Sequence, residues 1–341
     1  MELTERKQRI LSSVVNNFVQ YGEPVGSKTI ADEIGVSSAT IRNEMADLIQ
    51  LGLLEQPYTS AGRVPSQLGY QQYVRGLDYP KLPSEESRNY YDSRLHENVY
   101  DTRRLLGCVP EILSDDLKLT AVASSKIGDS TRVKAVQFVQ ISRRTAMLIL
   151  MSSAGTVSNR IFHCDYDLTV EILRMFFHIF NNKLSQVLIS EITVAFIQSM
   201  AISFGELSLL SASPLMALLE LAQETQKSEV LIRGEMNLLM YSELERSNVR
   251  YIVDFLDNQD MVNRLMSQAQ KKITVLIGYE TNEKALRDCS VVMERFYVKN
   301  IDVGKIAVIG TMRMNYEKVI SAVDYLSKKV GEMLTALTAE I

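Results

Sequence analysis

The chain has few of the residues from which metal centres and covalent active sites are built. Its 341 residues include three cysteines and three histidines. The cysteines lie far apart without a C-x-x-C pair, and the histidines lack the spacing of a zinc site. His163 adjoins Cys164, but adjacent residues on a strand point to opposite faces. We therefore expect no metal, no cofactor and no catalytic residue, and we interpret the cysteines as small buried apolar residues.

Long apolar runs are also missing from the sequence. The longest are about as long as Met147–Met151. This is far below the roughly 20 residues that a helix needs to span a bilayer. The N-terminal residues are mostly polar or charged and lack the apolar core of a secretory signal peptide. We therefore expect a soluble protein that is located in the cytoplasm.

An excess of positive charge is absent as well. Lys and Arg number 37 against 41 Asp and Glu, which gives a formal net charge of −4. This balance excludes a globally basic nucleic-acid coat, so any DNA-binding role must be local. Hydrophobic residues make up 46% of the chain, as in ordinary globular proteins, and the length predicts two or three domains.

Proline is concentrated in the first third of the chain. Six of the seven prolines precede residue 111, and only Pro214 follows it. Pro80 and Pro83 predict a linker, because proline interrupts both helices and sheet pairing. We therefore predict a first domain over residues 1–78, followed by a linker and a connecting helix over residues 79–108.

The first domain has the pattern of a helix-turn-helix. Apolar residues recur at helical spacing in three segments, which are residues 4–21, 27–34 and 38–51. Gly22 is a plausible end for the first helix. Only Gly35-Val36-Ser37 separates the second helix from the third, and this short turn with glycine is typical of a helix-turn-helix.

A small hairpin is predicted directly after the third helix. Residues 53–56 have strand character, and residues 58–64 begin with a turn that contains Gly62 and end in a return strand. A helix-turn-helix followed by such a hairpin is a winged helix, and Ser66 begins another short helix. The sequence therefore predicts an N-terminal winged helix-turn-helix domain.

The rest of the chain predicts an α+β domain with an insertion. Strand character is found over residues 133–142, 145–152, 157–164, 273–277, 290–297 and 305–311. Helices are predicted over residues 84–106, 168–226 and 315–338. We interpret this as one sheet interrupted by a helical block. The predicted division is a sheet domain over 109–164 plus 229–341, and an inserted, mainly helical domain over 165–228.

The candidate DNA-binding residues lie on the helix-turn-helix and the wing. An α-helix fits the major groove, where Arg42 would reach guanine or phosphate and Asn43 would suit adenine. Ser27 and Lys28 begin the second helix, whose N-terminal amides favour phosphate. The full set of candidates is Ser27, Lys28, Ser37, Ser38, Ala39, Thr40, Arg42, Asn43, Thr59, Ser60 and Arg63.

The charge of this domain leaves a second interpretation open. Residues 1–75 hold basic side chains at seven positions: Arg6, Lys7, Arg9, Lys28, Arg42, Arg63 and Arg75. They hold acidic side chains at eight positions: Glu2, Glu5, Glu23, Asp32, Glu33, Glu44, Asp47 and Glu55. A purely structural three-helix unit with an ordinary polar face would also fit. The few basic groups fall at the helix-turn-helix and the wing, however, which favours DNA.

Several segments resemble the bacterial heat-inducible transcription repressor family HrcA. They are residues 22–27, 37–48, 54–57, 59–70, 289–292 and 313–319, with further agreement at Gly234, Asn237-Leu238-Leu239 and Asp324-Tyr325. The resemblance covers nearly the whole chain. Two positions depart from the pattern of the family. Tyr58 stands where the family usually has histidine, and the loop Gly310–Met314 lacks the usual proline.

The resemblance implies a fold, a function and partners. It implies a winged-helix DNA-binding domain, a GAF-like α+β domain and an inserted dimerising domain. It also implies a homodimer that represses chaperone operons of the groE and dnaK type by binding the inverted repeat CIRCE. The GroE chaperonin would keep the repressor active until heat diverts it to unfolded proteins.

The residues themselves leave an alternative function open. A ligand-sensing winged-helix regulator would bind a small metabolite in its GAF-like domain and move its DNA-binding domain in response. The apolar helical insert, in turn, is able to bury its surface against a second copy of the chain, and a two-fold protein matches a palindromic operator. No nucleophile, base and metal constellation supports an enzyme.

Overall fold

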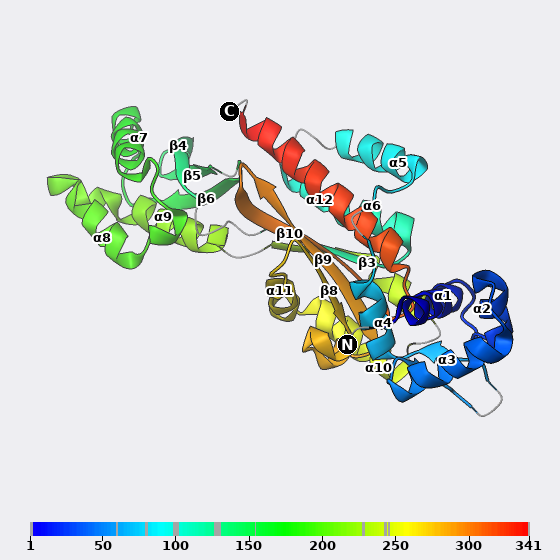
Figure 1. The fold of residues 1–341 in the computed structure, drawn as a ribbon. Coiled ribbons are helices and arrows are strands. Elements are labelled where there is room, and N and C mark those ends of the chain that lie inside the picture. Colours follow the sequence, from blue (N-terminus) through cyan, green and yellow to red (C-terminus); the bar gives the residue numbers. More distant parts are fainter. Residues whose placement is uncertain are drawn as a thin grey trace.

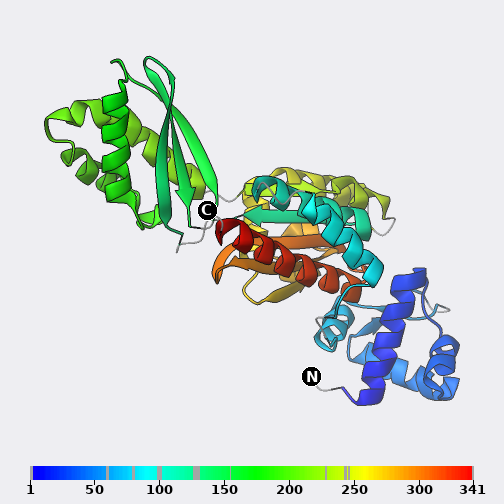
Figure 2. The ribbon, with the colours of Figure 1, turned by 90° about the horizontal axis from the view of Figure 1, so that it is seen from above.

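The computed structural model describes residues 3–58, 61–78, 81–97, 102–125, 131–153, 155–226, 229–241, 244 and 246–339. Three units lie in a row, with the N-terminal helical unit at one end and a mixed unit within residues 131–226 at the other (Figures 1 and 2). A five-stranded sheet with helices on both faces lies between them. Among the residues described, no helix is both long enough and apolar enough to cross a bilayer.

The first unit, called here the winged-helix unit, confirms the predicted helix-turn-helix with a hairpin. Its elements are α1 (Glu5–Tyr21), α2 (Ser27–Ile34), α3 (Ser38–Gln50), β1 (Leu54–Glu55), β2 (Val64–Pro65) and α4 (Gln67–Arg75). Gly22 and Gly35 end α1 and α2 with φ angles of 74° and 76°. This left-handed conformation favours glycine. β1 and β2 pair in antiparallel fashion and form the base of the wing.

The central unit is an antiparallel sheet of five strands in the order β7-β3-β10-β9-β8. The strands are β3 (Thr120–Ser125), β7 (Glu229–Arg233), β8 (Ile273–Ile277), β9 (Cys289–Val298) and β10 (Ile301–Thr311). β3 and β7 are neighbours although more than 100 residues separate them, and Ser125 lies opposite Glu229. The α+β class predicted from the sequence is thereby confirmed.

Helices cover both faces of the central sheet. One face carries α6 (Thr102–Leu117) and α12 (Tyr316–Ala339), on which α5 (Glu85–His96) packs. The other face carries α10 (Arg246–Asp257) and α11 (Gln259–Ser267). Alternate residues of β9 point to opposite faces of the sheet. Val292 packs on the side of α6 and α12, whereas Val291 and Met293 pack on the side of α10 and α11. Three short 3₁₀ helices complete the unit: η3 (Glu235–Met240), η4 (Gly278–Thr281) and η5 (Lys284–Leu286).

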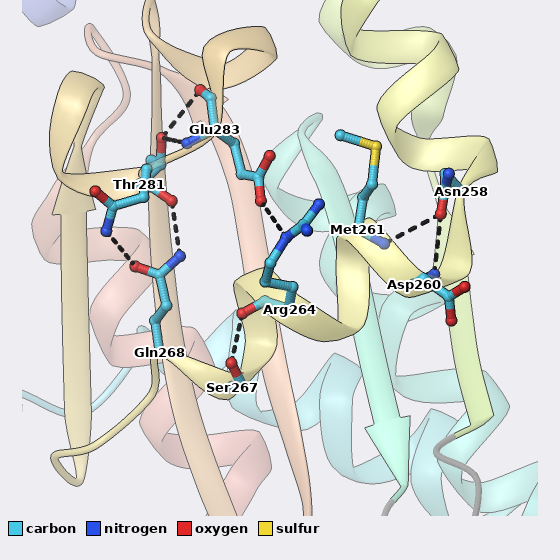
Figure 3. Close-up of polar contacts among 9 residues, drawn as sticks. Asn258, Asp260, Met261, Arg264, Ser267, Gln268, Thr281 and Glu283 are labelled. Atoms are coloured by element: carbon cyan, nitrogen blue, oxygen red, sulfur yellow. Dashed lines mark hydrogen bonds and ion pairs between the residues drawn. The ribbon is translucent and has the colours of Figure 1, made fainter.

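Side-chain hydrogen bonds fasten α11 to the segment that follows β8 (Figure 3). Gln268 donates through Nε2 to the carbonyl oxygen of Thr281 at 2.7 Å. Arg264 donates through Nε to Oε1 of Glu283 at 2.9 Å. Asn258 caps the start of α11, and its Oδ1 accepts from the amides of Asp260 and Met261. The segment after β8 is therefore held in place from one side by α11.

The third unit, called here the insert, has its own sheet and its own core. Its strands are β4 (Val133–Ser142), β5 (Thr145–Ser152) and β6 (Val157–His163), in the order β4-β5-β6. Its helices are α7 (Val170–Leu184), α8 (Val194–Ile202) and α9 (Ala212–Gln226), with η1 (Ile189–Glu191) and η2 (Gly205–Ser211). Phe176 and Phe180 of α7 are fully buried and surround Phe138 of β4. The helices cover one face of this sheet (Figure 2).

The single interrupted sheet predicted from the sequence is wrong. β4, β5 and β6 hydrogen-bond to one another and pack on α7 and α9, whereas none of them pairs with the described strands of the central sheet. The division at residues 164/165 would separate these strands from the helices that bury them. We therefore propose that the insert spans residues 131–226, and that the central unit is formed by residues 81–125 and 229–339.

The connecting segment also differs from the prediction. The helix predicted over residues 84–106 is two helices, since α5 ends at His96 and α6 begins at Thr102. α6 continues to Leu117 with Pro110 in its interior, so that it crosses the expected boundary at residues 108/109. Leu105, Val109 and Ile112 are fully buried. The apolar face of α6 packs on the sheet, which makes this helix part of the central unit.

All three cysteines are buried, as predicted. Burial raises the pKa of the Cys108 thiol to about 11 and that of Cys289 to about 12, so both thiols remain protonated at neutral pH. His163 is exposed whereas Cys164 is buried, which confirms that the two residues point to opposite sides. The three cysteines therefore pack as small apolar residues.

Candidate nucleic-acid interface

α3 has one buried and one solvent-facing side. Ile41, Met45 and Leu48 are buried in the core of the winged-helix unit. The predicted DNA-facing residues on the other side are exposed, and these are Ala39, Arg42 and Asn43, with Ala46 next to them. Small side chains at positions 39 and 46 allow close approach to a groove, while Arg42 and Asn43 provide hydrogen-bonding groups.

A shallow cleft lies between the start of α2 and the start of α3. Its lining includes five predicted site residues, which are Ser27, Lys28, Ser37, Ser38 and Arg42, together with Gly26 and Asp32. The structure therefore brings together residues from both helices of the helix-turn-helix. Lys28 and Arg42 are exposed at this cleft, where positive charge is suited to a phosphate group.

The first turn of α2 contributes backbone donors to the cleft. The N-cap residue is Gly26, and no side chain caps this helix. Its first amide groups are therefore not satisfied by a capping side chain, and they add the positive end of the helix dipole to the site. α3, in contrast, is capped by Ser37, whose Oγ accepts from the amide of Thr40 at 3.2 Å. An anion at this cleft would be bound mainly by the start of α2.

Serine and threonine hydroxyls hold the two helix starts together. Ser27 Oγ and Ser38 Oγ lie 3.0 Å apart and link α2 to α3. Ser37 Oγ and Thr40 Oγ1 lie 2.8 Å apart within the first turn of α3. Ser27, Ser38 and Thr40 are half-buried. The contact between Ser27 and Ser38 thus positions the two helices relative to each other, and that between Ser37 and Thr40 holds the first turn of α3.

The base of the wing is anchored to the loop between α1 and α2. The backbone of Arg63 exchanges two hydrogen bonds of 2.8 Å with that of Val25. Gly62 is required here, because an added Cβ would lie 2.6 Å from backbone atoms of Pro24 and Val25. The Arg63 side chain is half-buried, and its Nη1 donates to the carbonyl oxygen of Ala61 at 3.0 Å. Thr59 and Ser60, the other two predicted wing residues, lie outside the described residues.

Ion pairs explain how a nearly neutral unit presents a positive cleft. Lys7 of α1 lies 2.8 Å from Glu44 and 2.9 Å from Asp47, both on α3. The hydrogen bond to Glu44, followed by that to Asp47, raises the pKa of Lys7. Arg6 also approaches Glu44, at 3.7 Å. Both acidic groups of α3 are thus compensated from α1, on a different side of the helix from Arg42.

Two features of the interface are not among the predicted site residues. Gly26 is the N-cap of α2 and leaves the first amide groups of that helix without a capping side chain. The signal in the sequence was a glycine directly before Ser27, where the helix was predicted to begin. Lys7 contributes by pairing with the acids of α3, which depends on how α1 crosses α3 and not on a local pattern. Asp32 also lines the cleft and adds one negative charge to it.

Two protein-family models match separate segments of the chain. The family described as winged helix-turn-helix transcription repressor, HrcA DNA-binding, matches residues 2–75. The family described as HrcA protein C terminal domain matches residues 104–320. A crystal structure titled as that of a hypothetical protein has a TM-score of 0.66 with 20% identity, covering 98% of this chain and 100% of the other. That likeness supports the fold.

Curated relatives match at nearly full length. The heat-inducible transcription repressor HrcA of Acetivibrio thermocellus is 33% identical, over 99% of this chain and 98% of the relative. The protein of the same name from Carboxydothermus hydrogenoformans is 34% identical, over 97% of this chain and 98% of the relative. With its winged helix and its full-length match, the chain belongs to the HrcA family of heat-inducible transcription repressors, which are DNA-binding regulators and not enzymes.

Proposed function

We propose that this repressor binds an inverted-repeat operator, CIRCE, as a homodimer and controls chaperone operons of the groE and dnaK type. The site of action would be the cytoplasm. The observation that carries the proposal is the cleft formed by Lys28, Arg42 and the uncapped start of α2, beside the exposed side of α3. One helix would enter the major groove while the start of the other binds the phosphate backbone.

Roles for the individual residues follow from their positions. Arg42 and Asn43 are exposed on α3 and would read base edges, with Ala39 allowing close approach. Lys28 and the amides at the start of α2 would bind one phosphate. Ser27 and Ser38 would keep the two helices in register, Ser37 and Thr40 would hold the first turn of α3, and a hydroxyl of this group would add a phosphate contact. Thr59, Ser60 and Arg63 are proposed to contact the backbone or the minor groove from the wing.

Replacing Arg42 with alanine tests this interface. We expect the affinity for an inverted-repeat operator to fall about ten- to a hundredfold, which corresponds to the loss of about 1–3 kcal/mol of a groove contact. The fold should persist, because Arg42 is exposed. Gel-shift titration at fixed salt concentration measures the change, with circular dichroism as the check on folding. Arg9→Ala, at an exposed position of α1, is the matched control. Unchanged affinity in a folded Arg42→Ala protein would contradict the assignment.

The outer face of the insert sheet supports the homodimer. Val139, Ile141, Val157 and Ile161 are 44%, 54%, 57% and 59% exposed. Val139, Met147 and Ile161 lie side by side across the three strands. An exposed sheet face with apolar side chains of this kind is suited to bury itself against an equivalent face. We propose that this face is the contact between the two subunits.

Ile161→Lys should weaken self-association by at least about tenfold, because an unpaired ammonium would have to enter the contact. Ile161 is exposed, so that the folded subunit should tolerate the change. Sedimentation velocity over a concentration series measures the dissociation constant. Gln198→Lys, an exposed position on α8, provides the same charge outside the sheet face. An unchanged dissociation constant for Ile161→Lys would place the dimer contact elsewhere.

We further propose that heat relieves repression and that the GroE chaperonin keeps the repressor active. The resemblance to the HrcA family and the name of its relatives, heat-inducible repressors, support this proposal. The alternative of a metabolite-sensing regulator has less support. Both faces of the central sheet are filled by packed side chains.

A further inference from the structure

The winged-helix unit is packed directly against the central unit. A single hydrophobic cluster contains Ile10 and Leu48 of the winged-helix unit together with Ile277, Val292 and Val319 of the central unit. Figure 1 shows α1 and α4 next to the central sheet, with α2 and α3 on the outer side. The contact between the units therefore leaves the cleft between α2 and α3 open and does not cover the proposed DNA-binding surface.

Three tyrosine rings form the middle of this contact. Tyr316, at the start of α12, is 1% exposed. Its ring centroid lies 5.9 Å from that of Tyr70 and 6.4 Å from that of Tyr73, both on α4. The Tyr316 hydroxyl lies 2.7 Å from Ser290 Oγ on β9. One side chain thus connects the central sheet to the helix that supports the wing.

Two hydrogen bonds flank the tyrosines. Gln67 of α4 donates through Nε2 to the carbonyl oxygen of Ile277 at 2.9 Å. Arg313 donates through Nη1 to the carbonyl oxygen of Val19, near the end of α1, at 3.3 Å. The second contact is a close one, because a Cβ added at Gly22 would lie 2.8 Å from Arg313 Nη1. The contact therefore holds the winged-helix unit at two separate helices, α1 and α4.

The acceptor side of the Gln67 contact is itself held rigidly. Ile277 ends β8, and its amide donates to Oε2 of Glu280 at 3.0 Å. Gly278 has a φ angle of 57°, and a Cβ there would lie 2.4 Å from Gln67 Oε1. The network of Figure 3 fastens the same segment to α11. Gln67 thus meets a part of the central unit that is fixed from the other side.

We propose that Gln67, Arg313 and Tyr316 form a clamp that fixes the orientation of the DNA-binding surface, and that this clamp sets the operator spacing that the repressor accepts. The inference rests on the proposed homodimer and inverted repeat. Two rigidly held winged-helix units present their recognition helices at one separation, which must equal the separation of the half-sites. Loosely held units would tolerate several separations but would lose effective concentration for the second half-site.

The variant Gln67→Ala/Arg313→Ala tests the clamp, with binding measured to three DNAs at one salt concentration. These are a single half-site, the natural inverted repeat, and the repeat with its spacer lengthened by about two base pairs. We expect half-site affinity equal to that of the wild type. The ratio of affinities for the natural and the lengthened repeat should fall at least about tenfold. Arg250→Ala/Gln259→Ala, at exposed positions of α10 and α11, is the matched control.

A variant that binds the half-site normally and keeps the spacing preference of the wild type would overturn the proposal. Tyr316→Phe retains the ring that packs on Tyr70 and Tyr73 but loses the hydroxyl contacts to Ser290 and to the carbonyl oxygen of Met312, so it provides a second and milder test of how firmly the central unit positions this ring. Its control is Tyr325→Phe, on the same helix, which loses a contact to Asp92 instead. A loss of stability alone would not change a ratio between two operators.

A distance measurement in the absence of DNA tests the clamp independently of the proposed operator binding. Spin labels at Arg9→Cys and Gln259→Cys, diluted with unlabelled protein, report the distance between the two units, because the native cysteines are buried. We expect a narrow distribution in the wild type and a broadened one in Gln67→Ala/Arg313→Ala. Equal distributions would refute the clamp even if operator binding is normal. A narrow wild-type distribution with no operator binding would instead refute the proposed function.

Discussion

Glu294→Gln is expected to raise the free energy of unfolding by about 3 kcal/mol at pH 7, with little effect near pH 4.5. Glu294 lies on β9, is 1% exposed, and faces the equally buried Asp324 of α12. Burial, and then the nearby charge of Asp324, raises the pKa of Glu294 from 4.5 to about 8, which Lys272 and Lys328 offset only in part. Oε2 of Glu294 is buried without a hydrogen-bond partner among the described residues.

The sign of the effect follows from the direction of this shift. The pKa of Glu294 is higher in the folded protein than in the unfolded chain, so the folded state binds a proton that the unfolded state releases. The stability of the wild type is therefore complete below about pH 4.5 and falls as the pH rises toward 8. The loss approaches about 1.4 kcal/mol per pH unit within this window. Glutamine is neutral throughout and does not contribute such a loss.

Urea denaturation at pH 5, 6, 7 and 8 measures this prediction as a difference between wild type and variant. The stabilities of the two proteins should diverge as the pH rises. Glu332→Gln, at an exposed position of α12, is the matched control and should follow the wild type. Parallel curves for the wild type and Glu294→Gln would show that the carboxyl group is ionised in the folded protein.

Gly69→Ala should prevent the winged-helix unit from folding and abolish DNA binding. Gly69 is buried in α4, where the helix crosses the backbone that precedes the wing. A Cβ at this position would lie 2.1 Å from the carbonyl oxygen of Leu53, which already accepts from the amide of Ser66 at 3.1 Å. Neither backbone segment can move without breaking this arrangement, so we expect a loss of at least about 3 kcal/mol.

Gly76→Ala is the matched control for this prediction. Gly76 ends α4 with a φ angle of −89°, and an added Cβ would make only ordinary contacts at 3.5 Å and beyond. Thermal unfolding followed by circular dichroism, together with gel shifts, should show a lost or early transition for Gly69→Ala alone. A Gly69→Ala protein that binds the operator like the wild type would contradict the close packing of α4 on Leu53.

Local patterns predicted the winged-helix unit well, because its helices begin and end at capping residues that are adjacent to them in the sequence. Thr4 caps α1 and accepts from the amide of Lys7, and Ser37 caps α3. Gly22 and Gly35 end two helices in the conformation that favours glycine. The exposed positions of Arg42 and Asn43 also followed from helical spacing, since Ile41 and Met45 are buried beside them. Each of these features depends on residues a few positions apart.

The features that escaped prediction depend on distant partners. Alternation identified β4, β5 and β6 as strands, but it does not say which sheet a strand joins. The contact of Gln67 with Ile277 spans 210 residues. Glu294 alternates with Val292 and Phe296 and so shares their buried face, yet charge alone would place it in solvent. The burial of Glu294 and the sheet that β4, β5 and β6 join both depend on tertiary packing.

The neighbouring positions of β3 and β7 have a consequence for how this protein could vary. Ser125 and Glu229 lie opposite each other at the ends of adjacent antiparallel strands, so the chain leaves and re-enters the central sheet at one point. In topological terms the whole insert occupies the place of a hairpin turn. A unit connected in this way can be enlarged, exchanged or shortened without changing the order of any strand. The proposed pairing of subunits through the insert and the proposed reading of DNA would therefore be free to evolve separately.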